Sequence, residues 1–291
     1  MSEESGDAVE SIEYPIDADD AGEDEDGDQA QDVASLGLPM PVLEVDDALD
    51  LLRNGTLEVV GRLWASSNNA LLCVATRERS GRGAHSGGGA APLAAACVYK
   101  PVVGERPLGD FPDATLSRRE VAAFAASRAT GWDIVPPTVL RDGPFGEGMV
   151  QLWIRTDPDA DPVELVVRGD ERLRRIAVFD AAVNNTDRKA GHLLPVPGGH
   201  IYGVDHGVTF SPVPKLRTVL WNWRGDPFTP EETAVLKGLR RGLDHDLGTT
   251  LRTLLDPIEV RATARRIDDL LRAGVFPQPD PRRPALPWPP V

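Results

Sequence analysis

The sequence predicts an α+β fold of two lobes, an antiparallel sheet followed by a mainly helical region. Apolar runs of strand length dominate the first half of the chain, at 57–64, 70–76, 93–99, 134–141 and 149–154. Apolar residues at helical spacing dominate the second half, at 171–183, 229–243 and 257–273. The two patterns meet at a stretch rich in Asp and Pro, 155–162, which is typical of a linker.

Shifts in composition predict where the parts begin and end. We expect an N-terminal lobe over 36–156 with a flexible Gly/Ser/Arg-rich loop at 77–92, and a C-terminal lobe over 157–275. The ends of the chain differ from both lobes. Residues 1–35 are expected to be a disordered acidic tail, and residues 276–291 are either an extended Pro-rich strap over the body or a disordered tail.

The charge of the chain belongs to its acidic tail. Of the 46 Asp and Glu residues, 14 lie within 1–35 with no Lys or Arg, which leaves 32 acidic against 31 basic residues elsewhere. The body is therefore nearly neutral, and its net charge argues neither for nor against nucleic acid. We expect no nucleic acid partner. The tail is either a solubilising segment or a regulatory one that mimics an anionic substrate, and both tails are possible protein contact sites.

The sequence gives no indication of a membrane span or of a disulfide framework. No run of 18 apolar residues occurs and the N-terminus is acidic, so we expect a cytoplasmic protein without a transmembrane segment. The sequence also shows no basic amphipathic helix, so membrane docking is not expected. The two cysteines, Cys73 and Cys97, lie in apolar runs and are expected to be buried reduced thiols.

The first elements predict a helix and a sheet. Residues 43–53 have helical spacing and stop at Asn54 and Gly55. The runs 57–64 and 70–76 form a hairpin around small polar residues, and 93–99 adds a third strand.

One lysine stands at the end of that third strand. Lys100 is followed by Pro101, so the strand is expected to stop there. Lys100 is either an exposed lysine on the rim of the sheet or a cation held in a cleft to pair with phosphate oxygens.

The next helix begins at Ser117 and ends at Thr130–Gly131. Ser117 and Glu120 match a capping box, which would give Glu120 a structural role. Glu120 could instead pair with Lys100 and hold it in position, as a glutamate does beside the lysine strand of kinases. Both roles remain open at the level of sequence.

Two aspartates after the 171–183 helix carry the chemistry. Asp187 lies in a polar turn, Asp205 lies in an Asp-x-Gly turn, and a hairpin over 193–203 separates them. Phosphoryl transfer needs such a pair, because one carboxylate orients the attacking hydroxyl and another holds a metal ion against the phosphates. The ordered set of Lys100, Glu120, Asp187 and Asp205 therefore predicts a kinase-like phosphotransfer centre.

The motifs around these residues are Phe179-Asp180-x-x-x-x-Asn185-Thr186-Asp187-Arg188 and Asp205-x-Gly207, with Tyr99-Lys100-Pro101 before them and Leu220-Trp221-Asn222-Trp223 after them. Through these motifs the chain resembles the phosphatidylinositol 3-/4-kinase-like superfamily of atypical kinases, most closely the type II phosphatidylinositol 4-kinases, in a bacterial branch. The resemblance covers about 57–243 and implies a two-lobed protein-kinase-like fold.

The resemblance also implies roles. The implied catalytic residues are Lys100, Asp187 and Arg188. Lys100 would contact the α- and β-phosphates of ATP, Asp187 would be the catalytic-loop aspartate, and Asp205 would chelate Mg2+ or Mn2+. The implied nucleotide-contacting residues are Ser66, Ser67, Asn68, Lys100, Glu120, Gln151, Leu152, Trp153 and Ile154.

Two positions depart from the resemblance. The family has a metal-binding Asn five residues after the catalytic Asp, and here that position is His192, which is either a metal ligand or a satisfied loop histidine. His206 stands where protein kinases usually have Phe.

Two function classes therefore remain. The first is an ATP-dependent phosphotransferase acting on a small-molecule hydroxyl of inositol type or on a protein, with an AMP transferase as a variant on the same fold. The second is a nucleotide-binding pseudokinase that acts as a regulatory module, for which the missing Asn would be the signature.

Overall fold

A computed structural model describes residues 36–63, 69–78 and 91–291 of this chain. The predicted acidic tail, most of the predicted loop at 77–92, and the predicted phosphate-contacting residues Ser66, Ser67 and Asn68 lie outside these ranges. No helix among the described residues is both long enough and apolar enough to span a bilayer.

A five-stranded antiparallel sheet forms the first half of the described chain, as the sequence predicted. Its strands are β1 (Thr56–Leu63), β2 (Ala70–Arg77), β3 (Leu93–Pro101), β4 (Thr138–Gly143) and β5 (Gly146–Leu152), in the order β1-β2-β3-β5-β4. β4 begins later than the apolar run 134–141, because residues 134–137 are buried without joining the sheet, whereas β5 begins earlier than the run 149–154. The central strand, β3, ends at Pro101 just after Lys100.

Helix α2 (Val45–Asn54) covers one face of this sheet and completes a small core. Leu51 and Leu52 of the helix belong to one buried cluster with Cys73, Cys97 and other apolar side chains of the sheet. Both cysteines are buried and free, as predicted.

The second half is mainly helical. Its helices are α4 (Pro162–Arg168), α5 (Arg174–Val183), α6 (Pro230–Asp244), α7 (Asp246–Arg252) and α8 (Pro257–Ala273), with a short hairpin of β6 (Leu193–Pro195) and β7 (Ile201–Gly203). The sequence reading missed the two seven-residue helices, α4 and α7. Such short helices show little periodicity, and α4 begins inside the stretch that resembled a linker.

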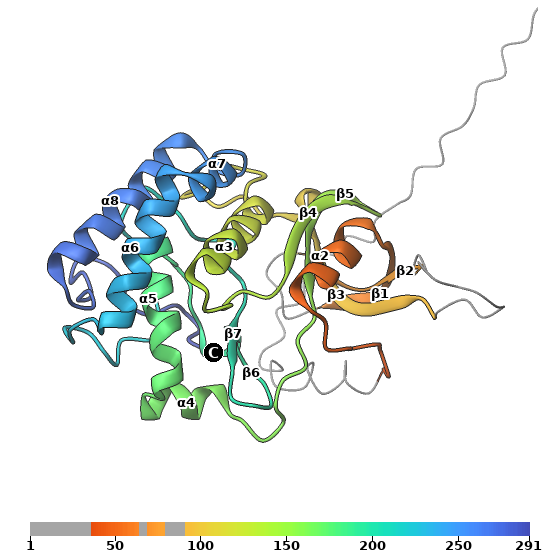
Figure 1. Cartoon of the computed structure of the whole chain (residues 1–291), viewed down its shortest axis with the longest axis horizontal. Helices are drawn as coiled ribbons and strands as arrows, with labels where there is room; N and C mark the ends of the chain where they lie inside the picture. The colour runs from red at the N-terminus through yellow and green to blue at the C-terminus, as the bar shows by residue number, and fades with distance from the viewer. Residues whose placement is uncertain (1–35, 64–68, 79–90) are drawn as a thin grey trace, which may run out of the picture.

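Helix α3 (Leu116–Thr130) lies between the sheet and the other helices (Figure 1). Its apolar side chains, among them Ala123 and Phe124, belong to the buried cluster of the helical half rather than to that of the sheet. Arg119 forms a buried ion pair with Glu259 of α8 at 2.7 Å and donates to the carbonyl of Thr209 at 2.9 Å. The helix that carries Glu120 is thus tied to the helical half by charge as well as by packing.

Two separate apolar clusters, one under the sheet and one among the helices, make the fold α+β with two lobes. The order of strand lysine, helix glutamate, Asp-containing loop, hairpin and Asp-x-Gly turn is that of a kinase-like fold. This is the fold class that the sequence predicted.

The Pro-rich C-terminal segment is an extended strap, one of the two predicted alternatives. Phe276 at its start is buried, and the carbonyl of Ala285 accepts hydrogen bonds from Thr218 N at 3.1 Å and Trp221 Nε1 at 3.0 Å. The carbonyl of Pro290 accepts from Ala190 N at 3.0 Å, so the strap ends beside the loop that carries Asp187. Figure 1 marks this end of the chain close to β6 and β7.

The buried thiols lead to a first prediction. Burial raises the pKa of Cys73 to about 11 and that of Cys97 to about 12, so almost no thiolate exists at pH 8. We expect iodoacetamide to label the native protein about a hundredfold or more slowly than the unfolded protein at that pH. The same protein in guanidinium chloride is the control, and rapid labelling of both cysteines in the native state would contradict the buried positions.

Candidate active site

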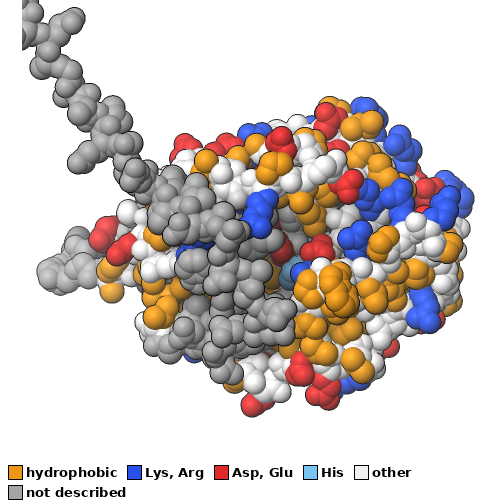
Figure 2. All heavy atoms as spheres, turned by 180° about the vertical axis from the view of Figure 1, so that it is seen from behind, with side chains coloured by type: hydrophobic (Ala, Val, Ile, Leu, Met, Phe, Trp, Pro, Cys, Tyr) orange, Lys and Arg blue, Asp and Glu red, His pale blue; other side chains and the backbone are white. Residues whose placement is uncertain are grey.

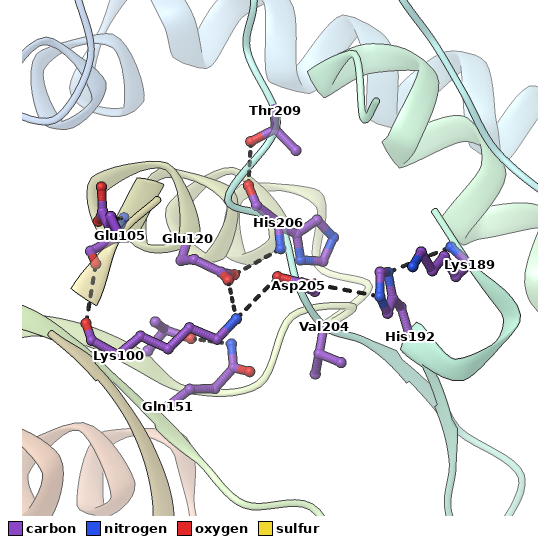
Figure 3. Close-up of polar contacts among 12 residues, drawn as sticks. Lys100, Glu105, Glu120, Gln151, Lys189, His192, Val204, Asp205, His206 and Thr209 are labelled. Carbon is purple, nitrogen blue, oxygen red and sulfur yellow. Dashed lines mark hydrogen bonds and ion pairs between the residues drawn. The ribbon is translucent and has the colours of Figure 1, made fainter. Parts of the chain in front are cut away.

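The site is organised around the ammonium group of Lys100. Strand β3 carries this side chain to the point where α3 and the Asp205 turn meet, and Figure 3 shows it extended toward both. Its Nζ donates to Glu120 Oε1 at 2.9 Å and to Asp205 Oδ1 at 3.0 Å. Although burial opposes the charge, these two carboxylates raise the pKa of Lys100 overall, so it remains a cation.

The geometry favours one of the two roles left open for Glu120. Helix α3 begins at Leu116, and Glu105 from the preceding loop caps it by accepting from Leu116 N at 2.9 Å and Ser117 N at 2.7 Å. The capping box of Ser117 and Glu120 is therefore not formed. Glu120 instead binds Lys100, and its second oxygen accepts from His206 N at 2.8 Å.

Asp205 sits in a turn with left-handed backbone geometry, φ 59°, which Asp tolerates better than most residues. Its carboxylate is 39% exposed, whereas that of Glu120 is 2% exposed. The ammonium of Lys100 holds the pKa of Asp205 well below its usual range, while burial raises that of Glu120. Asp205 is therefore an ionised and partly exposed carboxylate.

His192 lies on the other side of Asp205 (Figure 3). Its Nε2 is 3.4 Å from Asp205 Oδ2. Because burial lowers the pKa of His192 to about 4, the ring is neutral near pH 7 and this contact is polar rather than an ion pair. A neutral imidazole next to a carboxylate is a donor set that a divalent cation accepts.

The two predicted metal ligands, Asp205 and His192, are thus neighbours. Within the described residues no group of three or more His, Cys, Asp or Glu side chains is arranged to hold a metal ion. The pair still fits a phosphate-bridged cation, since Mg2+ usually takes one or two carboxylates and completes its shell with phosphate oxygens and water.

Asp187 lies on the loop after α5, whose end is marked by Asn184 in a left-handed conformation. The loop is held by Thr186 N, which donates to the carbonyl of Val208 at 3.1 Å, and by Asp187 N, which donates to Asn185 Oδ1 at 3.0 Å. Burial raises the pKa of the half-buried Asp187, with Lys189 opposing the shift. A carboxylate with a raised pKa is a better proton acceptor than an ordinary one.

Arg188, predicted to be catalytic, is not exposed to a substrate. It is fully buried, and its five N–H donors are used by Asp180 Oδ1 and Oδ2, the carbonyls of His192 and Val204, and His206 Nε2. The two bonds to Asp180 measure 2.8 and 3.0 Å. This arrangement makes Arg188 a positioning residue for the loop that carries Asp187.

His206 joins the two halves of the site. Arg188 can only donate, so His206 Nε2 accepts and the ring proton lies on Nδ1, a buried atom with no partner among the described residues. Burial holds the pKa of His206 well below its usual range, so the ring is neutral. The residue therefore links Arg188 through its ring to Glu120 through its backbone N–H.

Some backbone groups of the residues predicted to contact the nucleotide base, at the end of β5, already form hydrogen bonds within the protein. Leu152 N donates to the carbonyl of Pro137 at 2.9 Å, and Trp153 N donates to that of Ala96 at 3.0 Å, so these two N–H groups are not available to a base. Gln151 is buried and donates to Thr138 Oγ1 at 2.8 Å, close to Lys100 in Figure 3. Ile154 follows the end of β5 and is half-buried.

Sequence reasoning missed the buried partners of the site, above all Asp180. A signal for it exists: Asp180 is the one acidic residue in an otherwise apolar stretch of α5, and a charge that a helix must bury needs a partner. No comparable signal marked Glu105, which lies in an irregular loop.

Figure 2 shows acidic and histidine side chains together at the surface, beside a group of hydrophobic side chains.

Comparison with known proteins identifies one close relative. The chain is 39% identical to Protein Rv2133c of Mycobacterium tuberculosis over 279 aligned residues, which cover 84% of this chain and 95% of that protein. It belongs to the same family as Rv2133c. No protein-family model matches the chain.

Among solved structures, the chain is similar to the Helicobacter pylori proinflammatory kinase CtkA. The TM-score is 0.44 and the sequence identity is 9%, over 77% of this chain and 94% of that one. The resemblance to type II phosphatidylinositol 4-kinases remains a prediction from sequence motifs.

The buried pair of Arg188 and Asp180 leads to a stability prediction. Replacing Asp180 with Ala leaves the fully buried guanidinium without its counter-charge, and we expect the free energy of unfolding to fall by about 3–5 kcal/mol. Urea unfolding followed by circular dichroism measures the change. The control is Asp269→Ala, which removes an exposed ion pair with Arg272 and should change stability little. A loss no larger than that of the control would show that Arg188 is not held by this pair.

Proposed function

We propose that the protein is an ATP-dependent phosphotransferase that moves the γ-phosphoryl group to a hydroxyl acceptor. The observation that carries the proposal is the position of Lys100 between Glu120 and Asp205 at 2.9 and 3.0 Å. This places one fixed cation and one ionised carboxylate at the same point. Phosphoryl transfer depends mainly on such positioning and charge neutralisation.

In this proposal each residue has a distinct task. Lys100 binds the α- and β-phosphates, and Glu120 fixes the direction of its side chain. Asp205, with His192 beside it, would hold a divalent cation, which supplies charge neutralisation at the phosphates when bound. Lys100 and Asp205 would therefore act on the nucleotide, and Asp187 on the acceptor.

The proposed reaction is a transfer of the γ-phosphoryl group from ATP to the oxygen of a hydroxyl group. The acceptor hydroxyl oxygen forms a bond to the γ-phosphorus, and the bond from that phosphorus to the oxygen bridging to the β-phosphate breaks. ADP leaves with that electron pair, and the hydroxyl proton passes to the carboxylate of Asp187. The raised pKa of Asp187 suits this role, because burial makes the carboxylate a stronger base.

The contacts of Asp205 support a second candidate function, that of a nucleotide-binding pseudokinase. Both oxygens of Asp205 are already engaged, one by Lys100 at 3.0 Å and the other by His192 at 3.4 Å. A protein that binds nucleotide without turnover, a pseudokinase, would tolerate this arrangement permanently. An AMP transferase on the same fold would instead transfer the adenylyl group, with the acceptor oxygen bonding to the α-phosphorus and pyrophosphate leaving.

Labelled ATP separates these functions. Purified protein is incubated with γ-labelled or α-labelled ATP, with Mg2+ or Mn2+, and with candidate alcohols and proteins. We expect the γ-label alone to move. Movement of the α-label would indicate AMP transfer, and ATP binding without movement of either label across the acceptor panel would contradict the phosphotransferase.

The role of Asp187 gives a prediction for that assay. Asp187→Asn keeps the shape of the side chain but removes the proton acceptor, so the transfer rate should fall by about 10²–10⁴-fold while ATP affinity is kept. The rate of γ-label transfer under steady-state conditions measures the first quantity, and equilibrium binding of ATP measures its affinity. Asp269→Asn on the exposed face of α8 is the matched control. Unchanged turnover in Asp187→Asn would remove this residue from the mechanism.

His192 gives a prediction for metal preference. An imidazole ligand suits Mn2+ better than Mg2+, whereas an amide oxygen suits Mg2+. We expect wild-type activity to be higher with Mn2+ than with Mg2+, to disappear with EDTA, and to shift toward Mg2+ in His192→Asn. The ratio of the two rates is the measurement, and an identical ratio in wild type and variant would show that His192 is not a ligand.

A further inference from the structure

The chain that follows the Asp205 turn returns to lie against the loop that carries Asp187. Arg217 N donates to the carbonyl of Asn185 at 3.0 Å, Arg188 N donates to the carbonyl of Arg217 at 3.0 Å, and Val219 N donates to that of Arg188 at 3.0 Å. Arg217 thereby pairs with the residues on both sides of Asp187. The backbone geometry holds Arg217 next to the carboxylate proposed to receive the acceptor proton.

Arg217 and Lys189 are two cations that form no ion pair within 4 Å in the described part of the chain. Neither makes an ion pair with a carboxylate there, although both lie near enough to Asp187 to lower its pKa. Other cations of this region are already committed. Lys215, two residues before Arg217, pairs with Asp110 at 2.6 Å, and Arg188 is saturated inside the protein.

The guanidinium of Arg217 is also incompletely satisfied. Its Nε is buried and has no hydrogen-bond partner among the described residues. Buried donors are normally paired, and an unpaired one at a site indicates a missing ligand or water. A guanidinium is suited to bind a phosphate or carboxylate through two parallel hydrogen bonds.

The position of Arg217 separates it from the nucleotide end of the site. Lys100 contacts Asp205 and Glu120 directly, whereas Arg217 lies in the segment whose neighbour, Lys215, reaches Asp110 in the loop before α3. Two cations thus lie near enough to Asp187 to act on its charge, and neither is bound to Glu120 or Asp205. An acceptor that carries its own negative group would be oriented by them.

We propose that Arg217, assisted by Lys189, binds an anionic group of the acceptor, so that the substrate is an alcohol bearing a phosphate monoester or a carboxylate. This inference rests on the proposed function, because only a phosphotransferase has an acceptor. Binding of an anion at Arg217 does not itself require turnover. The same cations could instead serve the γ-phosphate of ATP, and the experiment separates the two sources.

Inorganic phosphate is the first probe and glycerol 3-phosphate is the second. Glycerol, which lacks the negative group, is the neutral control ligand. Each is titrated calorimetrically into the full chain saturated with a non-hydrolysable ATP analogue and Mg2+. We expect phosphate and glycerol 3-phosphate to bind this complex and glycerol not to bind. Arg217→Ala should weaken binding of both anions about tenfold or more, and Arg217→Lys less. Affinity for the ATP analogue should change less than about twofold in either variant.

Arg261→Ala on the exposed face of α8 is the matched control and should bind the anions as wild type does. Circular dichroism and urea unfolding show that each variant is folded. Loss of analogue affinity in a folded Arg217→Ala protein would assign the cations to the γ-phosphate and overturn the proposal. Equal anion binding by wild type, Arg217→Ala and Arg261→Ala would also overturn it.

The outcome is independent of the labelled-ATP assay. If no label moves but phosphate binding still depends on Arg217, the phosphotransferase fails and the anion subsite stands. If the γ-label moves and the anions bind without Arg217, the phosphotransferase stands and the subsite fails.

Discussion

The ammonium of Lys100 is the group on which the site depends. It comes from the sheet, it binds Glu120 from a helix packed with the other lobe, and it binds Asp205 from the turn after the hairpin. An ammonium that is only 16% exposed needs compensation, and the two carboxylates provide it. The same contact thus joins the two lobes and compensates the charges of the site.

The support behind this contact is buried and mostly ionic. Arg119 and Glu259 hold α3 against α8, while Asp180, Arg188 and His206 hold the Asp187 loop against the Asp205 turn. The four charged side chains of these pairs are almost completely removed from water, so each must keep its partner. Because Arg119 and Glu120 are neighbours on α3, the ion pair of Arg119 also keeps the helix that carries Glu120 in place.

Uncommitted groups are as informative as the paired ones. Asp187 and Arg217 lie side by side, yet the described residues offer neither side chain a hydrogen-bond partner, whereas nearby Lys215, Arg188 and Asp205 are all engaged. Polar groups left without partners in a half-buried place are the ones that a substrate can satisfy. In the proposed function, these free groups would lie on the acceptor side and Lys100 on the nucleotide side.

The sequence by itself determined the two-lobed α+β class and the order of Lys100, Glu120, Asp187 and Asp205, because strand and helix periodicity and turn residues are local signals. It could not choose between the two roles of Glu120, and it placed Arg188 among the catalytic residues. Tertiary structure decided both, since Glu105 caps α3 in place of Ser117 and Asp180 draws Arg188 into the core. The physical reason is that buried charges are satisfied by partners from distant parts of the chain, whose positions depend on the packed fold rather than on local pattern.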